Sequence, residues 1–131
     1  MKRRTIGFVS MLVGMIPAVA LGEVDISKTM LCALTEAIEC GYESQCSYGP
    51  VDELNLPPFI RVDPGAKTLT EHNGNRKTVV GSATNKDGQL VLQGIENRAY
   101  SISITASTGR LSASTAGPDV GFVFFGACTN P

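Results

Sequence analysis

The sequence of 131 residues contains no tryptophan, a single histidine (His72) and only 6% aromatic residues. Such a composition offers few side chains for stacking on nucleic-acid bases and cannot supply a histidine-rich metal site. A formal net charge of −1 also provides no basic surface to attract phosphate groups. We therefore expect no nucleic-acid partner, no zinc chemistry and no cofactor.

Motifs for enzymatic chemistry are also missing from the sequence. It contains no nucleophile elbow, zinc-protease helix motif, phosphate-binding glycine loop or EF-hand loop. His72 lies in the turn-like stretch 71–75, which is more typical of a solvated loop histidine than of a catalytic base. Carboxylates such as Asp63 and Glu71 could act as an acid–base pair, but no pattern shows that two of them converge. The sequence predicts a protein that is not an enzyme.

Residues 1–22 have the three parts of a secretory signal peptide. The basic residues Lys2, Arg3 and Arg4 are followed by an apolar stretch and then by small residues, with cleavage predicted after Ala20 or Gly22. The apolar stretch is too short, and too interrupted by glycine and proline, to predict a membrane span. We therefore expect a periplasmic or secreted protein whose mature part, residues 23–131, is a single domain.

Four cysteines, an even number in a chain expected to be exported, predict two disulfides, for which three pairings are possible. Cys40 and Cys46 flank a short polar loop that could bring two strand ends within bonding distance. We therefore predict the pair Cys40–Cys46, which leaves Cys32–Cys128 to join the two ends of the mature chain. A zinc site is the competing interpretation, but there is no C-x-x-C spacing and His72 is distant in sequence.

Short strand patterns separated by turn signals dominate the mature chain. The clearest covers residues 100–105, where bulky apolar residues alternate with small polar ones. The pair Asp87-Gly88 supplies the positive φ that a tight hairpin needs. Together the patterns predict an antiparallel up-and-down meander of about eight or nine strands. The expected strands cover residues 35–40, 46–48, 59–63, 67–71, 77–84, 89–94, 100–105, 110–116 and 120–127.

About eight strands is the number at which such a sheet can close and remove its exposed edges. We therefore expect an all-β fold built as a closed or nearly closed small barrel. Two segments could be helical: residues 50–55 could form one turn, and residues 25–34 place Ile26, Met30 and Leu34 at helical spacing. The N-terminal helix has an alternative, because residues 31–40 also fit an extended strand.

Two features indicate where a ligand or partner could bind. In the last predicted strand, Phe122, Phe124 and Phe125 place bulk on both faces. One face of this strand is expected to lie in the core. The other face is either covered by the N-terminal segment or presents an apolar strip to a partner. Arg61 could point into a barrel lumen and hold an anion, or it could point outward into solvent.

One succession of segments runs through most of the mature chain: residues 37–40 with Cys46, then 56–63, 87–94 and the tail from 108–111 through 120–128. In these segments the chain resembles uncharacterised small exported β-proteins of Gram-negative bacteria. In size, disulfides and export it is also similar in outline to the small periplasmic barrels that inhibit lysozyme. The resemblance implies an exported β-protein and no particular activity.

Composition, pattern and resemblance together predict an exported, non-enzymatic binding module. Its expected target is a small apolar or amphipathic ligand, or a protein partner in the envelope. The alternative is a periplasmic inhibitor of a hydrolase, similar to the lysozyme inhibitors, or an accessory protein of envelope stress. An apolar pocket would favour the first function, and a protruding polar loop would favour the second.

Overall fold

The computed structural model describes residues 22–54 and 56–131, so residues 1–21 of the predicted signal peptide lie outside the described residues. The described residues form ten strands and one short 3₁₀ helix, η1. None of their helices is long and apolar enough to cross a membrane. The elements are β1 (Met30–Gly41), β2 (Ser47–Pro50), η1 (Val51–Leu54), β3 (Phe59–Asp63), β4 (Thr68–Glu71), β5 (Lys77–Val79), β6 (Ser82–Lys86), β7 (Gln89–Ile95), β8 (Ala99–Thr105), β9 (Arg110–Ala116) and β10 (Val120–Thr129).

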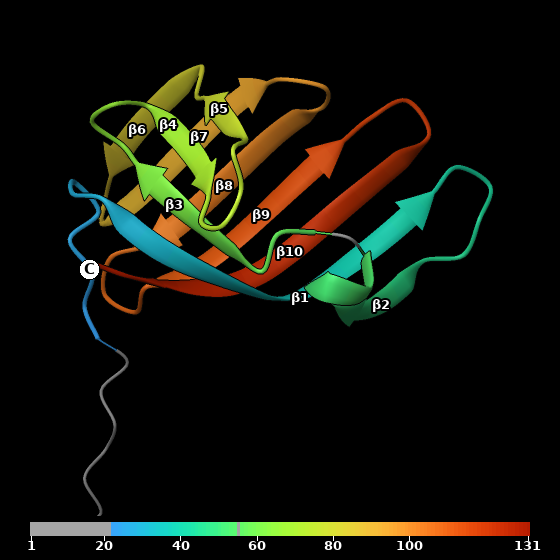
Figure 1. Ribbon diagram of the computed structural model, residues 1–131, viewed down its shortest axis with the longest axis horizontal. Helices are drawn as coiled ribbons and strands as arrows, with labels where there is room; N and C mark the ends of the chain where they lie inside the picture. Colours follow the sequence, from blue (N-terminus) through green and yellow to red (C-terminus); the bar gives the residue numbers. More distant parts are fainter. Residues whose placement is uncertain (1–21, 55) are drawn as a thin grey trace, which may run out of the picture.

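All ten strands belong to one antiparallel sheet that curls into a half-barrel (Figure 1). The strand order is β5-β4-β3-β1-β10-β9-β8-β7-β6, with β2 beside β1 and off this path. Sequential hairpins run from β3 to β5 and from β6 to β10, and β1 joins these two parts because it pairs with both β3 and β10. The predicted all-β antiparallel fold is confirmed.

The two edges of the sheet, β5 and β6, are consecutive in the chain and are joined only by Val80 and Gly81. The sequence pattern predicted a single strand over residues 77–84, but the chain breaks at these two residues. Val80 is buried in the core, and Gly81 lies so close to β7 that a Cβ there would come within 3.2 Å of the Gln93 carbonyl oxygen. The break puts β5 and β6 at opposite edges and leaves a seam between them.

Side chains hold the β5 edge against the opposite half of the sheet without strand pairing. The Tyr100 hydroxyl donates a hydrogen bond to the Val79 carbonyl at 3.2 Å, and the Thr78 hydroxyl donates to the Glu96 carboxylate. These contacts link β5 to β8 and to the turn before it. They hold β3, β4 and β5 in front of β7, β8 and β9, as Figure 1 shows.

Residues 26–28 form a turn and strand β1 begins at Met30, so the strand alternative for residues 31–40 is confirmed and the predicted helix over residues 25–34 is wrong. Residues Met30 and Cys32, two apart in β1, are both fully buried, which is the alternation of a strand. Pairing with β3 on one side and β10 on the other satisfies the backbone groups of β1, which overrides the helical spacing. Within the described residues, η1 confirms the predicted helical turn at 50–55.

Both predicted disulfides are confirmed. Cys32 and Cys128 are directly opposite each other in β1 and β10, and Cys40–Cys46 closes the β1–β2 hairpin. The carboxamide of Asn130 also binds the N-terminal segment, because it accepts from the Asp25 amide at 2.7 Å and donates to the Asp25 carbonyl at 3.1 Å. The C-terminus therefore lies beside the start of the described chain (Figure 1). Two disulfides are consistent with an oxidising extracellular or periplasmic location.

The core has two parts. The main cluster fills the half-barrel near the Cys32–Cys128 disulfide, and a smaller cluster lies where η1 meets β1 and β10. Leu34 and Ala113 pack against both clusters. The main cluster consists of Val24, Ile26, Met30, Cys32, Val62, Val80, Leu90, Leu92, Ile102, Ile104, Leu111 and Cys128, and the smaller one of Ala37, Val51, Phe122 and Phe124.

Candidate functional site

The concave side of the half-barrel holds a groove of about 560 Å³. This volume lies within the range of roughly 300–1,000 Å³ that is typical of small-molecule sites. The groove takes residues from both core clusters and from the turns at its mouth. Its lining residues are Leu34, Leu56, Pro57, Ile60, Leu69, Arg76, Thr78, Glu96, Asn97, Arg98, Tyr100, Ile102, Leu111, Ala113, Thr115, Phe122 and Phe124.

The groove runs along β9, the middle strand of its floor. Strand β9 carries small side chains there, whereas the strands on either side of it, β8 and β10, carry large ones. Directly opposed residues of antiparallel strands project to the same face. Ala113 and Thr115 therefore form the bottom of a trough with β8 and β10 as its walls. Two rows of opposed residues cross the three strands: Tyr100, Thr115 and Phe122, and then Ile102, Ala113 and Phe124.

The β10 wall of the groove is aromatic. The rings of Phe122 and Phe124 are stacked, with 5.8 Å between their centres and 9° between their planes. The Arg98 guanidinium lies 5.1 Å from the centre of the Phe122 ring, a cation–π arrangement. The mouth of the groove thus places a cation directly beside an apolar wall.

Arg98 is positioned by two turns. In the β7–β8 turn, the Glu96 amide donates to the Arg98 carbonyl at 3.3 Å. The Arg98 side chain then passes beside Gly117 of the β9–β10 turn, where a Cβ would lie 3.2 Å from Arg98 Nε. Glycine at this position leaves room for the arginine to reach the Phe122 ring.

The other charged groups of the mouth have partners. Arg76 Nε lies 3.6 Å from Glu71 Oε1, and Glu96 accepts a hydrogen bond from Thr78. Burial, and secondly the nearby Glu96 charge, raise the pKa of the Tyr100 phenol. In the part of the chain that the structure describes, Arg98 has no ion pair with a carboxylate.

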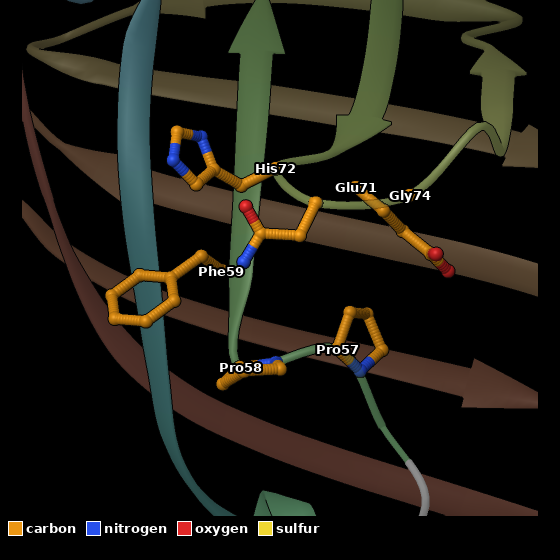
Figure 2. A pocket seen from close by; sticks show the side chains of 7 residues that line it. Pro57, Pro58, Phe59, Glu71, His72 and Gly74 are labelled. Carbon is orange, nitrogen blue, oxygen red and sulfur yellow. The ribbon is translucent and has the colours of Figure 1, made fainter.

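A smaller hollow of about 190 Å³ lies outside the groove, where β3 begins and β4 ends (Figure 2). The rings of Phe59 and His72 project to one side of it, with 6.3 Å between their centres, and Glu71 projects to the other. The backbone amide of His72 donates to the Phe59 carbonyl at 3.1 Å. His72 is exposed, so the loop interpretation is confirmed, and Asp63 lies at the opposite end of the β3–β4 hairpin from Glu71.

The structure brings together only some of the residues predicted for binding. Phe122 and Phe124, 9% and 7% exposed, line the groove. Phe125 is 41% exposed on the other face of β10, and the N-terminal strand lies beside β10 rather than over it. Arg61 is exposed on the face of β3 opposite the buried Val62, so it points outward and does not reach the groove.

Sequence reasoning missed the residues that shape the groove. The alternation in residues 110–116 already placed the small residues Ala113 and Thr115 on one face, and that pattern could have indicated a trough. Arg98 gives no such signal, because it lies in a polar turn and meets Phe122 only through the fold.

No protein-family model, curated protein or solved structure matches this chain. The comparisons therefore neither support nor oppose the resemblance to exported β-proteins and lysozyme inhibitors. The described residues contain no group of three or more His, Cys, Asp or Glu side chains that could hold a metal ion. The candidate site therefore rests on the geometry of the groove.

Proposed function

We propose that this protein is an exported, non-enzymatic binding module whose groove holds a small amphipathic ligand. The observation that carries the proposal is the trough along β9, where Ala113 and Thr115 lie between walls that carry Ile102, Phe122 and Phe124, with Arg76, Glu96 and Arg98 as the charged lining residues. Apolar walls with a few placed polar groups are what small-molecule sites share. A ligand with a hydrocarbon part and a polar end would match both regions.

The side chains around the groove support binding without turnover. Among the described lining residues, Glu96 is the only carboxylate, and it accepts a hydrogen bond from Thr78. His72 lines the smaller hollow instead. A hydrolytic site would need a second acid or a base close to the same ligand.

The proposal includes export, which the predicted signal peptide and the two disulfides support. Intact-mass analysis of the periplasmic and secreted fractions should find the chain beginning at Leu21 or Glu23. Full-length chain in the cytosol with four free thiols would contradict export.

The binding function is tested by filling the trough. Ala113→Leu should fill it, whereas Ser114→Leu introduces the same side chain at an exposed position of the same strand on the other face. The probe is N-phenylnaphthylamine, a neutral amphipathic dye whose fluorescence rises in apolar sites. We expect saturable binding by the wild type and by Ser114→Leu, and binding at least tenfold weaker in Ala113→Leu. The proposal fails if the dye does not bind saturably, or binds both folded variants equally.

A second candidate function, inhibition of a hydrolase, is favoured by one feature. The tip of the β1–β2 hairpin projects beside the β9–β10 turn at one end of the molecule (Figure 1). It is held by Cys40–Cys46 and by a 2.8 Å hydrogen bond from the Tyr42 amide to the Asp119 carbonyl, while the Tyr42 side chain is 77% exposed. A rigid, exposed tip of this kind could enter an enzyme cleft. Lysozyme inhibition that is lost in Tyr42→Ala and kept in Ala113→Leu would favour this function over ligand binding.

A further inference from the structure

We infer that the ligand of the groove carries an anionic head, which Arg98 binds at the mouth while the hydrocarbon part lies along β9 against Phe122 and Phe124. This inference rests on the proposed function and specifies the ligand of that same groove. The class it names is a single-chain amphiphile with a carboxylate-like head.

The first reason for an anionic head is the arrangement of charged side chains at the mouth of the groove. Arg76 is paired with Glu71, whereas the Glu96 carboxylate accepts a hydrogen bond from the Thr78 hydroxyl, which points it toward β5 and leaves its charge in place. Within the described residues, Arg98 has no ion pair, although its side chain lies over an apolar wall. The Arg98 guanidinium has the apolar Phe122 ring on one side and is open to a ligand on the other. An anionic group of the ligand would be favoured at this position, because it supplies the counter-charge that Arg98 lacks.

The contact of Arg98 with the ring is the basis of the second step. The guanidinium carbon lies over the Phe122 ring at 5.1 Å from its centre, and the guanidinium has five N–H donors. These donors form a fork that matches the two oxygens of a carboxylate. Because Arg98 is already held over Phe122 and beside Gly117, binding would cost little side-chain entropy.

The trough carries the third step. It runs along β9 from Thr115, in the row of Phe122 below Arg98, through Ala113 to Leu111. The four steps between these five strand residues extend over about 13 Å, at ~3.3 Å per residue. That length suits an extended alkyl chain of medium size, with its head at Arg98 and its end against the main core cluster.

The test compares three ligands with matched chains by titration calorimetry: decanoate and decyltrimethylammonium below their micelle concentrations, and decanol below its solubility limit. We expect decanoate to bind the wild type about tenfold more tightly than decanol, and the cation to bind most weakly. Arg98→Gln should remove the preference for decanoate over decanol, measured as the ratio of the two affinities in the same variant, and Arg98→Lys should restore part of that preference. Arg61→Gln removes an exposed arginine from the convex face and should change neither affinity.

Two results separate this inference from the proposed function. Equal binding of all three ligands, or tighter binding of the cation, would overturn the anionic head and leave the groove function standing. A preference for decanoate that survives in Arg98→Gln would overturn the role of Arg98. If none of the three ligands binds, the groove function fails and this inference fails with it.

Discussion

The hydroxyl of Tyr100 in β8 lies 3.2 Å from the backbone carbonyl of Val79, and this hydrogen bond ties the edge strand β5 to the third strand from the opposite edge. The edges are consecutive in the chain but do not pair as strands. The seam therefore depends on side chains, and Tyr100 also forms part of the groove lining. Closure of the half-barrel and the shape of the groove are thus linked through one residue.

Tyr100→Phe should lower the free energy of unfolding by about 1 kcal/mol, the usual contribution of a single hydrogen bond. Urea unfolding at neutral pH measures this change. Tyr42→Phe is the control, because the Tyr42 side chain is exposed at the hairpin tip. An equal loss in both variants would contradict a specific role for the seam hydrogen bond.

The same residue predicts a dependence on alkaline pH. The pKa of Tyr100 is raised in the folded protein by burial and then by Glu96, so folding favours the neutral phenol. Its contribution to stability is complete below the ordinary tyrosine pKa of about 10 and is lost as pH rises through the raised value. The unfolding free energy of the wild type should therefore fall more steeply above about pH 10 than that of Tyr100→Phe. Parallel curves for the two proteins would contradict this prediction.

Gly94 allows Tyr100 to reach the seam. A Cβ at Gly94 would lie 2.7 Å from Cζ of Tyr100, so Gly94→Ala must displace the ring and break its contact with Val79. We expect Gly94→Ala to destabilise the wild type by about 1–3 kcal/mol, as overpacking does. In a Tyr100→Ala background the same change should be neutral or stabilising, because alanine is preferred to glycine in a strand once the ring is gone. Additive effects in the double variant would contradict the clash.

The two disulfides should differ in their contribution to stability. Cys32–Cys128 spans 96 residues and Cys40–Cys46 spans 6. In the chain-entropy model, the longer loop stabilises by about 2 kcal/mol more. Replacing the first pair by alanines should therefore lower the unfolding free energy by more than replacing the second. An equal loss, measured by urea unfolding of both double variants, would contradict this prediction.

Phe124 and Phe125 are neighbours in the chain but should respond oppositely to a charge. Phe124→Asp would bury an unpaired carboxylate in the smaller core cluster, which costs several kcal/mol and should unfold the domain. Phe125→Asp changes a side chain on the convex face, so the domain should stay folded and keep its affinity for the neutral dye. Circular dichroism and dye titration measure both outcomes. Unfolding of Phe125→Asp would show that its face is covered.

Local sequence patterns were sufficient to predict those structural features that are determined by residues close together in the chain. The strands over residues 59–63 and 110–116 have the predicted bounds, because alternation of apolar and polar residues is a property of the strand itself. The local hairpin disulfide Cys40–Cys46 followed from its short loop, and the remaining pair followed from it. The bulk of Phe122, Phe124 and Phe125 on both faces of the last strand is also visible in the sequence, and the structure places the first two on the concave face and the third on the convex face.

Features that depend on distant partners required the tertiary structure. The N-terminal segment fits both a helix and a strand in isolation, and its pairing with β3 and β10 decides between them. The break at Val80 and Gly81 likewise depends on the core and on β7, not on residues 77–84 alone.

By itself the sequence determined an all-β chain with two disulfides, because strand alternation, turn residues and cysteine spacing are local properties. Only the tertiary structure decided where the sheet opens and what its concave face presents. Arg98 and Phe122 are 24 positions apart, and they meet because β8, β9 and β10 bring the two turns of the mouth together. Side-chain contacts between distant segments arise from the packing of the whole sheet, and no local pattern encodes them.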